Sequence, residues 1–159
     1  MTIRSYQPQD HSQIVTLFDE FQDYLVSLDP LQRLRRLPGY GEYYLQKTLD
    51  EVAANDGIFK VAADLDDIVG FATGIVMKLT QGDLFELVPS IRGRITELFV
   101  RLSHRGQGIG TRLMQDVEAY LVQHGCDVIR VGVFVPNQNA HQFYKNLGYQ
   151  DMDIRRYRK

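Results

Sequence analysis

The sequence predicts a mixed α/β fold, organised as a single domain over residues 1–159. Three observations support this prediction. The chain is long enough for one domain with a sizeable core. Apolar segments with the period of a strand alternate with segments that have the period of a helix. One of those helices joins two apolar strands, and such a crossover places its strands side by side and parallel. The other strands are expected to be antiparallel.

The N-terminal part is expected to form a strand and then two helices. Residues 2–6 read as a short strand, and Asp10, with Gln13 three residues later, has the pattern of a capping box at a helix start. Apolar residues at helical spacing follow until Pro30 interrupts them. A basic and aromatic connection over 31–44, partly helical and broken at Pro38-Gly39, leads to a second helix that ends at 55–57.

The period then changes to that of strands. Residues 58–77 read as two strands joined by a tight turn at "DLDD", hence a β-hairpin. A loop over 78–90 leads to a strong strand candidate at 91–100.

The C-terminal part is expected to contain two more helices and two more strands. After the segment "RGQGIG", a helix begins at Ile109 and stops at Gly125. Residues 127–135 are rich in β-branched side chains and read as a buried strand. A short helix closed by Gly148 follows, and the charged segment 152–159 reads as a strand at an edge of the sheet.

Composition and charge exclude several classes of function. The formal net charge is −2, which gives no general attraction to nucleic acid. No apolar run approaches 18 residues, so no membrane partner is expected. The single cysteine, Cys126, cannot form an internal disulfide and suits a reducing compartment, where we expect it to be inert. The expected location is cytoplasmic.

The glycines of "RGQGIG", residues 105–110, lie where a strand gives way to a helix. The first amide groups of a helix have no internal partner, and the positive end of the helix dipole lies there. Without Cβ atoms, a ligand can approach this backbone closely, which makes a phosphate site. The alternative is a tight turn that needs glycine for its dihedral angles alone. A Walker A string is absent, and Thr111 replaces the third glycine of a Rossmann fingerprint.

A third kind of phosphate loop fits better. "RGQGIG" matches the pattern R/Q-x-x-G-x-G/A, and "NQNAHQFYKNLGY" at 137–149 matches N-x-x-A-x-x-F-Y-x-x-L-G-F/Y. With "IVGFATG" at 68–74 and "ITELFV" at 95–100 as its third and fourth strands, the sequence resembles the GCN5-related N-acetyltransferase (GNAT) family over roughly residues 57–150.

The resemblance implies a central, mostly antiparallel sheet flanked by helices, with fourth and fifth strands that splay apart. It also implies binding of acetyl-CoA. Backbone amides of the glycine loop would wrap the pyrophosphate, and the edge of the fourth strand would pair with the pantetheine arm. The cofactor residues that it implies are Leu98, Phe99, Val100, Arg105, Gly106, Gln107, Gly108, Ile109, Gly110, Thr111, Asn137 and Tyr144.

Acetylation of an amine requires a base, because amines are protonated near neutral pH. Glu97 is the candidate, a charged residue inside an apolar strand; the alternatives are that it faces solvent or pairs with Arg94, with Glu86 as the reserve base. A backbone N–H near Leu98 or Phe99 would polarise the thioester carbonyl.

The departing thiolate requires a proton. The family resemblance gives that role to Tyr144; the alternative is a core-packing aromatic, a role that Phe143 is expected to fill. No metal is required. His104 and His141 have no partner at metal-ligand spacing and are expected to face solvent.

The predicted function is therefore transfer of an acetyl group from acetyl-CoA directly to a primary amine of a small molecule or peptide. The alternative is a non-catalytic domain that binds acyl-CoA as a sensor or interaction module. In the family, the region between the first two helices lines the acceptor site. Arg33, Arg35 and Arg36 there would either hold an acidic group of the substrate or form a solvated helix face. A homodimer is possible, since dimers are frequent in the family.

Overall fold

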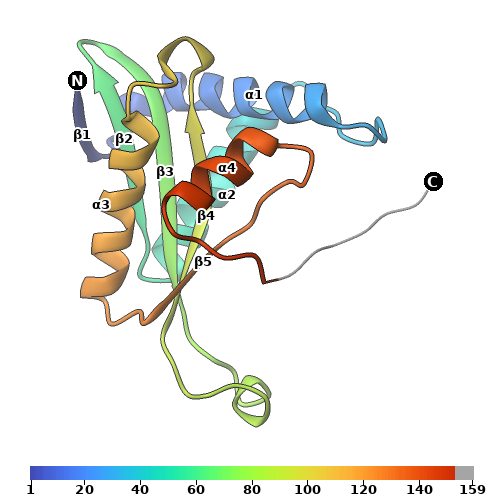
Figure 1. Cartoon of the computed structure of the whole chain (residues 1–159). Helices are drawn as coiled ribbons and strands as arrows, with labels where there is room; N and C mark the ends of the chain where they lie inside the picture. Colours follow the sequence, from blue (N-terminus) through green and yellow to red (C-terminus); the bar gives the residue numbers. More distant parts are fainter. Residues whose placement is uncertain (153–159) are drawn as a thin grey trace.

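The computed structural model describes residues 1–152 and shows a five-stranded sheet with helices on both faces (Figure 1). The strands are β1 (Thr2–Ser5), β2 (Ile58–Asp64), β3 (Asp67–Met77), β4 (Arg92–Val100) and β5 (Val128–Val131). The helices are α1 (His11–Leu28), α2 (Tyr40–Ala54), α3 (Ile109–Gln123) and α4 (Gln138–Asn146), with single 3₁₀ turns at Pro8–Asp10, Asp83–Phe85 and Leu102–His104.

The sheet confirms the predicted mixed topology. Its strand order follows the chain, β1-β2-β3-β4-β5, with antiparallel pairing up to β4 and parallel pairing of β4 with β5. The predicted hairpin is β2 and β3, with its turn at 64–67. The final strand expected over 152–159 falls, apart from Met152, outside the described residues.

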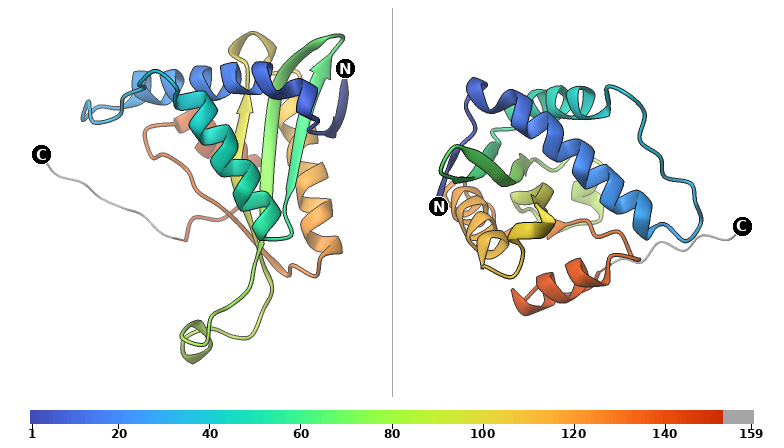
Figure 2. Two further views of the ribbon diagram at one scale, coloured as in Figure 1. Left: turned by 180° about the vertical axis from the view of Figure 1, so that it is seen from behind. Right: turned by 90° about the horizontal axis from the view of Figure 1, so that it is seen from above.

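Two apolar layers cover the sheet (Figure 2). Helices α1 and α2 pack on one face, where the Phe18 and Phe71 rings lie 4.6 Å apart. Helix α3 covers the other face through Leu113, Val117 and Leu121, all completely buried, and α4 joins this second layer. In the described part of the chain, no helix is both long and apolar enough to cross a membrane.

The capping box expected at Asp10 is wrong. The Asp10 carboxylate makes no cap bond to α1; it accepts two hydrogen bonds of 2.7 Å from Arg4 and one of 2.8 Å from the Gln7 amide. Gln13 instead donates to the Asp66 carbonyl and accepts from the Ile68 amide, which ties α1 to the turn between β2 and β3. Apart from the adjacent Gln7, these partners come from other elements, so the local pattern could not reveal them.

The middle of β4 changes the regular geometry of the sheet. Thr73 pairs with Glu97 but the next residue, Gly74, pairs with Ile95, so Thr96 is an extra residue in β4 and forms a β-bulge. Pairing of β4 with β5 stops at Ile95 and Val131, although β4 continues to Val100. The strand expected over 127–135 is therefore shorter, and beyond Ile95 the edge of β4 has no strand beside it.

Candidate active site

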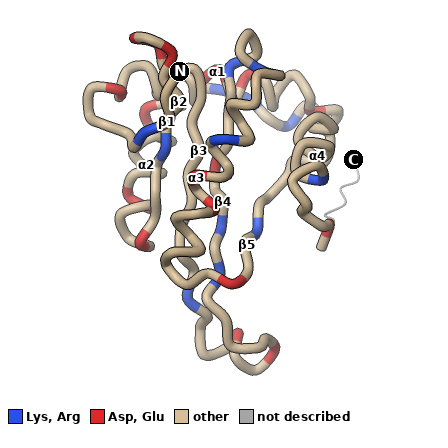
Figure 3. Tube along the Cα trace, turned by 60° about the vertical axis from the view of Figure 1, so that its left-hand side comes forward, with Lys and Arg blue, Asp and Glu red and all other residues tan. Residues whose placement is uncertain are grey.

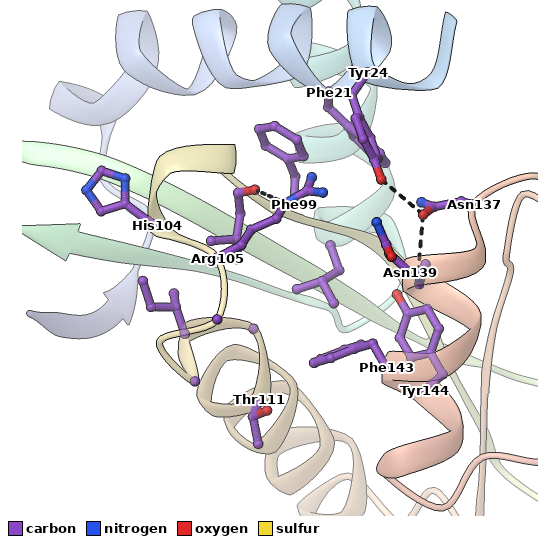
Figure 4. A pocket seen from close by; sticks show the side chains of 17 residues that line it. Phe21, Tyr24, Phe99, His104, Arg105, Thr111, Asn137, Asn139, Phe143 and Tyr144 are labelled. Atoms are coloured by element: carbon purple, nitrogen blue, oxygen red, sulfur yellow. Dashed lines mark hydrogen bonds between the residues drawn. The ribbon is translucent and has the colours of Figure 1, made fainter. Parts of the chain in front are cut away.

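A cavity of about 340 Å³ lies where β4 ends and α3 begins, bounded by α1 and α4 (Figure 4). Its walls come from three parts of the chain that are far apart in sequence, at 21–24, 98–111 and 137–144. The lining residues are Phe21, Tyr24, Leu98, Phe99, Val100, His104, Arg105, Gly106, Gly108, Ile109, Gly110, Thr111, Asn137, Asn139, Ala140, Phe143 and Tyr144.

The glycine loop forms the floor of this cavity. Gly106 and Gly108 have φ angles of 76° and 75°, in the left-handed region that favours glycine. Gly108 is the N-cap of α3 and offers no side-chain cap. Within residues 1–152, no backbone amide from 106 to 111 donates to a backbone carbonyl. These free donors, at the positive end of the α3 dipole, make a site for an anion such as a phosphate.

The third glycine has a different structural reason. A Cβ atom at Gly110 would lie 3.3 Å from the Phe143 ring, so glycine there allows α3 and α4 to approach closely. A Cβ atom at Gly106 or Gly108 would meet no protein atom within 4 Å. Gly106 and Gly108 are therefore required by their dihedral angles, and both face free space. Gly110 is required by its packing against Phe143.

Arg105 holds the loop to its surroundings. Its Nε donates to the Val100 carbonyl at 2.9 Å, and its guanidinium lies over the Tyr24 ring at 4.3 Å and the Phe99 ring at 5.6 Å. The Tyr24 hydroxyl donates to Asn137 Oδ1 at 3.3 Å (Figure 4). Helix α1, the loop and α4 are thus linked around the cavity.

Asn137 caps α4 at the opposite side of the cavity. Its side-chain oxygen accepts from the Ala140 amide at 3.2 Å, in addition to the bond from Tyr24. The Asn137 side-chain oxygen therefore already accepts from two protein donors, while the amide hydrogens of the same side chain are available to a ligand.

The open edge of β4 forms another wall. Leu98 and Val100 pack toward the α3 layer, while Phe99 lies in the α1 and α2 layer. Because β5 has diverged, the backbone groups on this side of residues 96–99 face the gap rather than another strand. An extended chain that carries amides could pair with them.

Glu97 does not line the cavity itself but lies on the face of β4 toward α2. The bulge at Thr96 reverses the alternation of the strand, so Glu97 shares a face with Phe99 instead of with Ile95. Burial, aided by the negative charge of Glu51, raises its pKa to about 7 from an ordinary 4.5, against the opposing effects of Arg94 and Lys47. Arg94 is paired with Glu51 at 3.9 Å rather than with Glu97.

Tyr144 reaches the cavity from α4. Its side chain is buried, yet among the described residues its hydroxyl has no hydrogen-bond partner (Figure 4). Burial and the nearby Glu97 raise the pKa of this phenol, so it stays protonated at neutral pH. Phe143 packs against the core, as expected, but it is only partly buried, between Gly110 and the cavity, and Tyr144 beside it also belongs to the buried core.

Four further residues that the sequence singles out have defined positions relative to the cavity. His141 is partly buried with its Nε2 enclosed, so the expectation that it faces solvent is wrong. His104 is partly exposed, lines the cavity and contacts Ser103 Oγ at 2.8 Å through Nδ1. Gln107 is exposed and does not line the cavity. Glu86 is exposed in the connection between β3 and β4, away from the cavity.

Sequence reasoning missed several cavity residues. Phe21 and Tyr24 lie three residues apart on α1, a spacing that reads as an ordinary core face of a helix. Asn139 and Ala140 lie inside the motif at 137–149, in which the resemblance implies contacts only for Asn137 and Tyr144.

Comparison with known proteins agrees with this geometry. The model of the Acetyltransferase (GNAT) family matches residues 16–149. A thialysine N-epsilon-acetyltransferase from Bos taurus is 34% identical over 58 residues, which are 36% of this chain and 34% of the relative. The matched stretch spans about a third or less of the curated relatives.

Solved structures share the fold over nearly the whole chain. A protein from Bacillus halodurans has a TM-score of 0.86 at 21% identity, covering 100% of this chain and 99% of that one. An aminoglycoside N-acetyltransferase in complex with CoA has a TM-score of 0.70 at 17% identity, covering 99% and 98%. The family match and the loop, open strand edge and mixed sheet lead to one conclusion: this chain belongs to the GNAT acetyltransferase family.

Proposed function

We propose that this protein transfers an acetyl group from acetyl-CoA directly to a primary amine of a small molecule or peptide. The observation that carries the proposal is the presence of three features in or beside one cavity. These are the free amides at 106–111, the open edge of β4, and two groups with raised pKa values, Glu97 and Tyr144.

The cavity fits acetyl-CoA in its chemistry. The amides of Gly108 to Thr111 would hold the diphosphate. The free edge at Leu98 would pair with the amides of the pantetheine arm, and the apolar Phe99 and Val100 face the same space. When bound, the coenzyme supplies the acetyl group as an activated thioester.

Glu97 would act as the general base. A carboxyl group with a pKa of about 7 ionises at neutral pH and is still basic enough to accept a proton from an ammonium group, directly or through water. With Glu97 as the base, its position on the α2 side of β4 supports an acceptor on the face opposite α3.

Tyr144 would supply the proton that the departing sulfur needs. Its hydroxyl is free of protein partners in the described residues and faces the cavity, and its raised pKa keeps it protonated. A thiolate with an ordinary pKa of about 8.5 can take a proton from a phenol held within hydrogen-bond distance.

The similarity to a thialysine acetyltransferase supports a small amine as acceptor. The test is release of free CoA thiol from acetyl-CoA in the presence of a panel of diamines, amino acids, aminoglycosides and peptides. The proposal expects amine-dependent release, with kcat/KM rising through an apparent pKa near 7 that Glu97→Gln abolishes. Tight binding of CoA with no thiol release for any amine would favour a non-catalytic acyl-CoA-binding module instead.

A further inference from the structure

Three arginines lie on the open face of β4 and β5. Arg94 of β4 pairs in register with Arg130 of β5, and Arg92 precedes Arg94 by two residues. Side chains alternate along a strand, and the neighbours Gly93 and Ile95 lie against α3. The three guanidinium groups therefore leave the sheet on the face opposite α3, and Figure 3 shows basic positions along both strands.

This arginine cluster shares its face with Glu97. Without the bulge, Glu97 would follow Gly93 and Ile95 toward α3; the extra residue Thr96 turns it to the opposite side. Glu97 follows Arg94 by three positions, at most roughly 10 Å along the strand. A substrate with its amine at Glu97 could reach the arginine cluster with its remote end.

The arginine cluster carries positive charge that nearby acids only partly balance. Glu51 pairs with Arg94 at 3.9 Å. The pKa of Asp83 is lowered mainly by hydrogen bonds from Thr80 and also by Arg92 and Arg130, yet its carboxylate is held by the Thr80 amide at 2.7 Å and hydroxyl at 2.6 Å. In residues 1–152, neither Arg92 nor Arg130 has a carboxylate within 4.0 Å.

Among residues 1–152, two of the guanidinium groups thus lack a strong acceptor. The only hydrogen bond of the Arg130 side chain within that range goes to the Met77 sulfur, at 3.3 Å, and the Nε of Arg92 is buried with no hydrogen-bond partner in the described part of the chain. A buried donor without an acceptor is costly, and an arginine fork matches the oxygens of a carboxylate or phosphate.

The arginines between the first two helices are poorer candidates for this role. Arg36 donates to Asp23 at 2.7 Å and lies 3.8 Å from Asp19, so its charge is already balanced. Arg33 and Arg35 are exposed. The sequence-based expectation of an acid-binding arginine group is therefore better met on β4 and β5.

We propose that the amine acceptor carries an anionic group, a carboxylate or a phosphate, several bonds from its amine, and that Arg92, Arg94 and Arg130 bind that group. The proposal rests on the acetyl transfer proposed above and narrows its substrate to amines with a remote acid.

The test compares acceptors that differ only in the anionic group. Thiol release is measured with hexylamine, 6-aminohexanoate and 6-aminohexyl phosphate, and with glycine, whose acid is too close to its amine. The wild type should have a KM at least tenfold lower for one of the two long anionic amines than for hexylamine. The acceptor with the lower KM, 6-aminohexanoate or 6-aminohexyl phosphate, shows whether the arginine cluster binds a carboxylate or a phosphate.

Arg130→Gln should reduce this KM ratio about tenfold, with Arg33→Gln as the matched control that keeps the wild-type ratio. Equal KM values for hexylamine and both acids, unchanged by Arg130→Gln, would overturn the arginine assignment while amine-dependent thiol release still supports acetyl transfer.

If no amine releases thiol, acetyl transfer itself fails, and calorimetry then decides the arginine assignment separately. Binding of 6-aminohexanoate or 6-aminohexyl phosphate to the CoA-saturated protein should be about tenfold weaker in Arg130→Gln than in Arg33→Gln. Equal binding, or none, would overturn it.

Discussion

The carboxyl group at position 97 ionises near neutral pH because burial opposes its negative charge. That property suits a base, but it has a thermodynamic consequence. In the unfolded chain the group ionises near its ordinary pKa of 4.5, whereas in the folded protein it ionises at about 7. The contribution of Glu97 to stability should therefore fall as pH rises between these two values and then level off, with a total loss of about 3 kcal/mol.

Glu97→Gln should remove this penalty. At pH 8.5 the variant should be more stable than the wild type by up to about 3 kcal/mol, and at pH 4 the difference should largely vanish. Urea unfolding at both pH values measures it, with exposed Glu86→Gln as the control that shows no such dependence. A stability difference that is the same at both pH values would contradict a raised pKa at Glu97.

The Tyr144 hydroxyl can be tested without disturbing its ring. Tyr144→Phe should lower kcat by roughly 10²–10⁴-fold if the phenol is the acid, because the thiolate loses its proton donor. Since the hydroxyl has no partner among the described residues, the loss of stability should be small. Steady-state kinetics and thermal unfolding measure the two effects.

Tyr149→Phe is the matched control for Tyr144→Phe. In the wild type, the Tyr149 hydroxyl donates to Glu118 at 2.6 Å, and the Tyr149 ring lies 5.8 Å from that of Tyr144. Tyr149 does not line the cavity. This control should lose about 1 kcal/mol of stability and keep its turnover. A Tyr144→Phe variant that turns over like the control would remove Tyr144 from the mechanism.

Among the elements, α2 and α3 begin in closely similar ways. Gly39 is the N-cap of α2 with φ 82° and ψ 4°, and Gly108 is the N-cap of α3 with φ 75° and ψ 4°. At both positions an added Cβ would meet no protein atom within 4 Å. Alanine should therefore strain both by a similar amount, roughly 1–2 kcal/mol.

Only one of the two helix starts is proposed to bind a phosphate. Gly108→Ala should weaken CoA binding at least tenfold, because its methyl group projects into the space where the diphosphate meets the backbone, whereas Gly39→Ala should leave it unchanged. Calorimetric titration with CoA measures both variants. Equal CoA affinities of the two variants would mean that glycine is required at position 108 only for its dihedral angle.

The elements also show which features a sequence can reveal. The glycine loop, the hairpin and the helical crossover depend on residues close together in the chain, and the structure has them where the pattern predicted. The bulge that turns Glu97 toward α2 depends on pairing with Thr73 of another strand. Similarly, the bond between Tyr24 and Asn137 joins residues 113 positions apart. The spacing of residues within one segment of the sequence does not reveal such contacts.

In the molecule as a whole, the cavity depends on elements from both halves of the chain. Helix α1 contributes Phe21 and Tyr24, α4 contributes Phe143 and Tyr144, and Arg105 joins Tyr24 to the end of β4. A ligand in this cavity would contact both apolar layers of the sheet at once. Its binding free energy should therefore be linked to unfolding of the whole fold rather than to one segment.

This linkage predicts a thermal shift on addition of CoA. At a concentration one hundred times Kd, a ligand that binds only the folded protein adds about 2.7 kcal/mol. For a chain of this length that corresponds to a rise in Tm of about 5–10 °C. Calorimetric scans with CoA measure it, and Gly108→Ala at the same CoA concentration should show a smaller rise. Pantetheine, which lacks the diphosphate, should raise Tm far less than CoA at equal concentration; an equal rise would mean that the free amides at 106–111 do not hold the diphosphate.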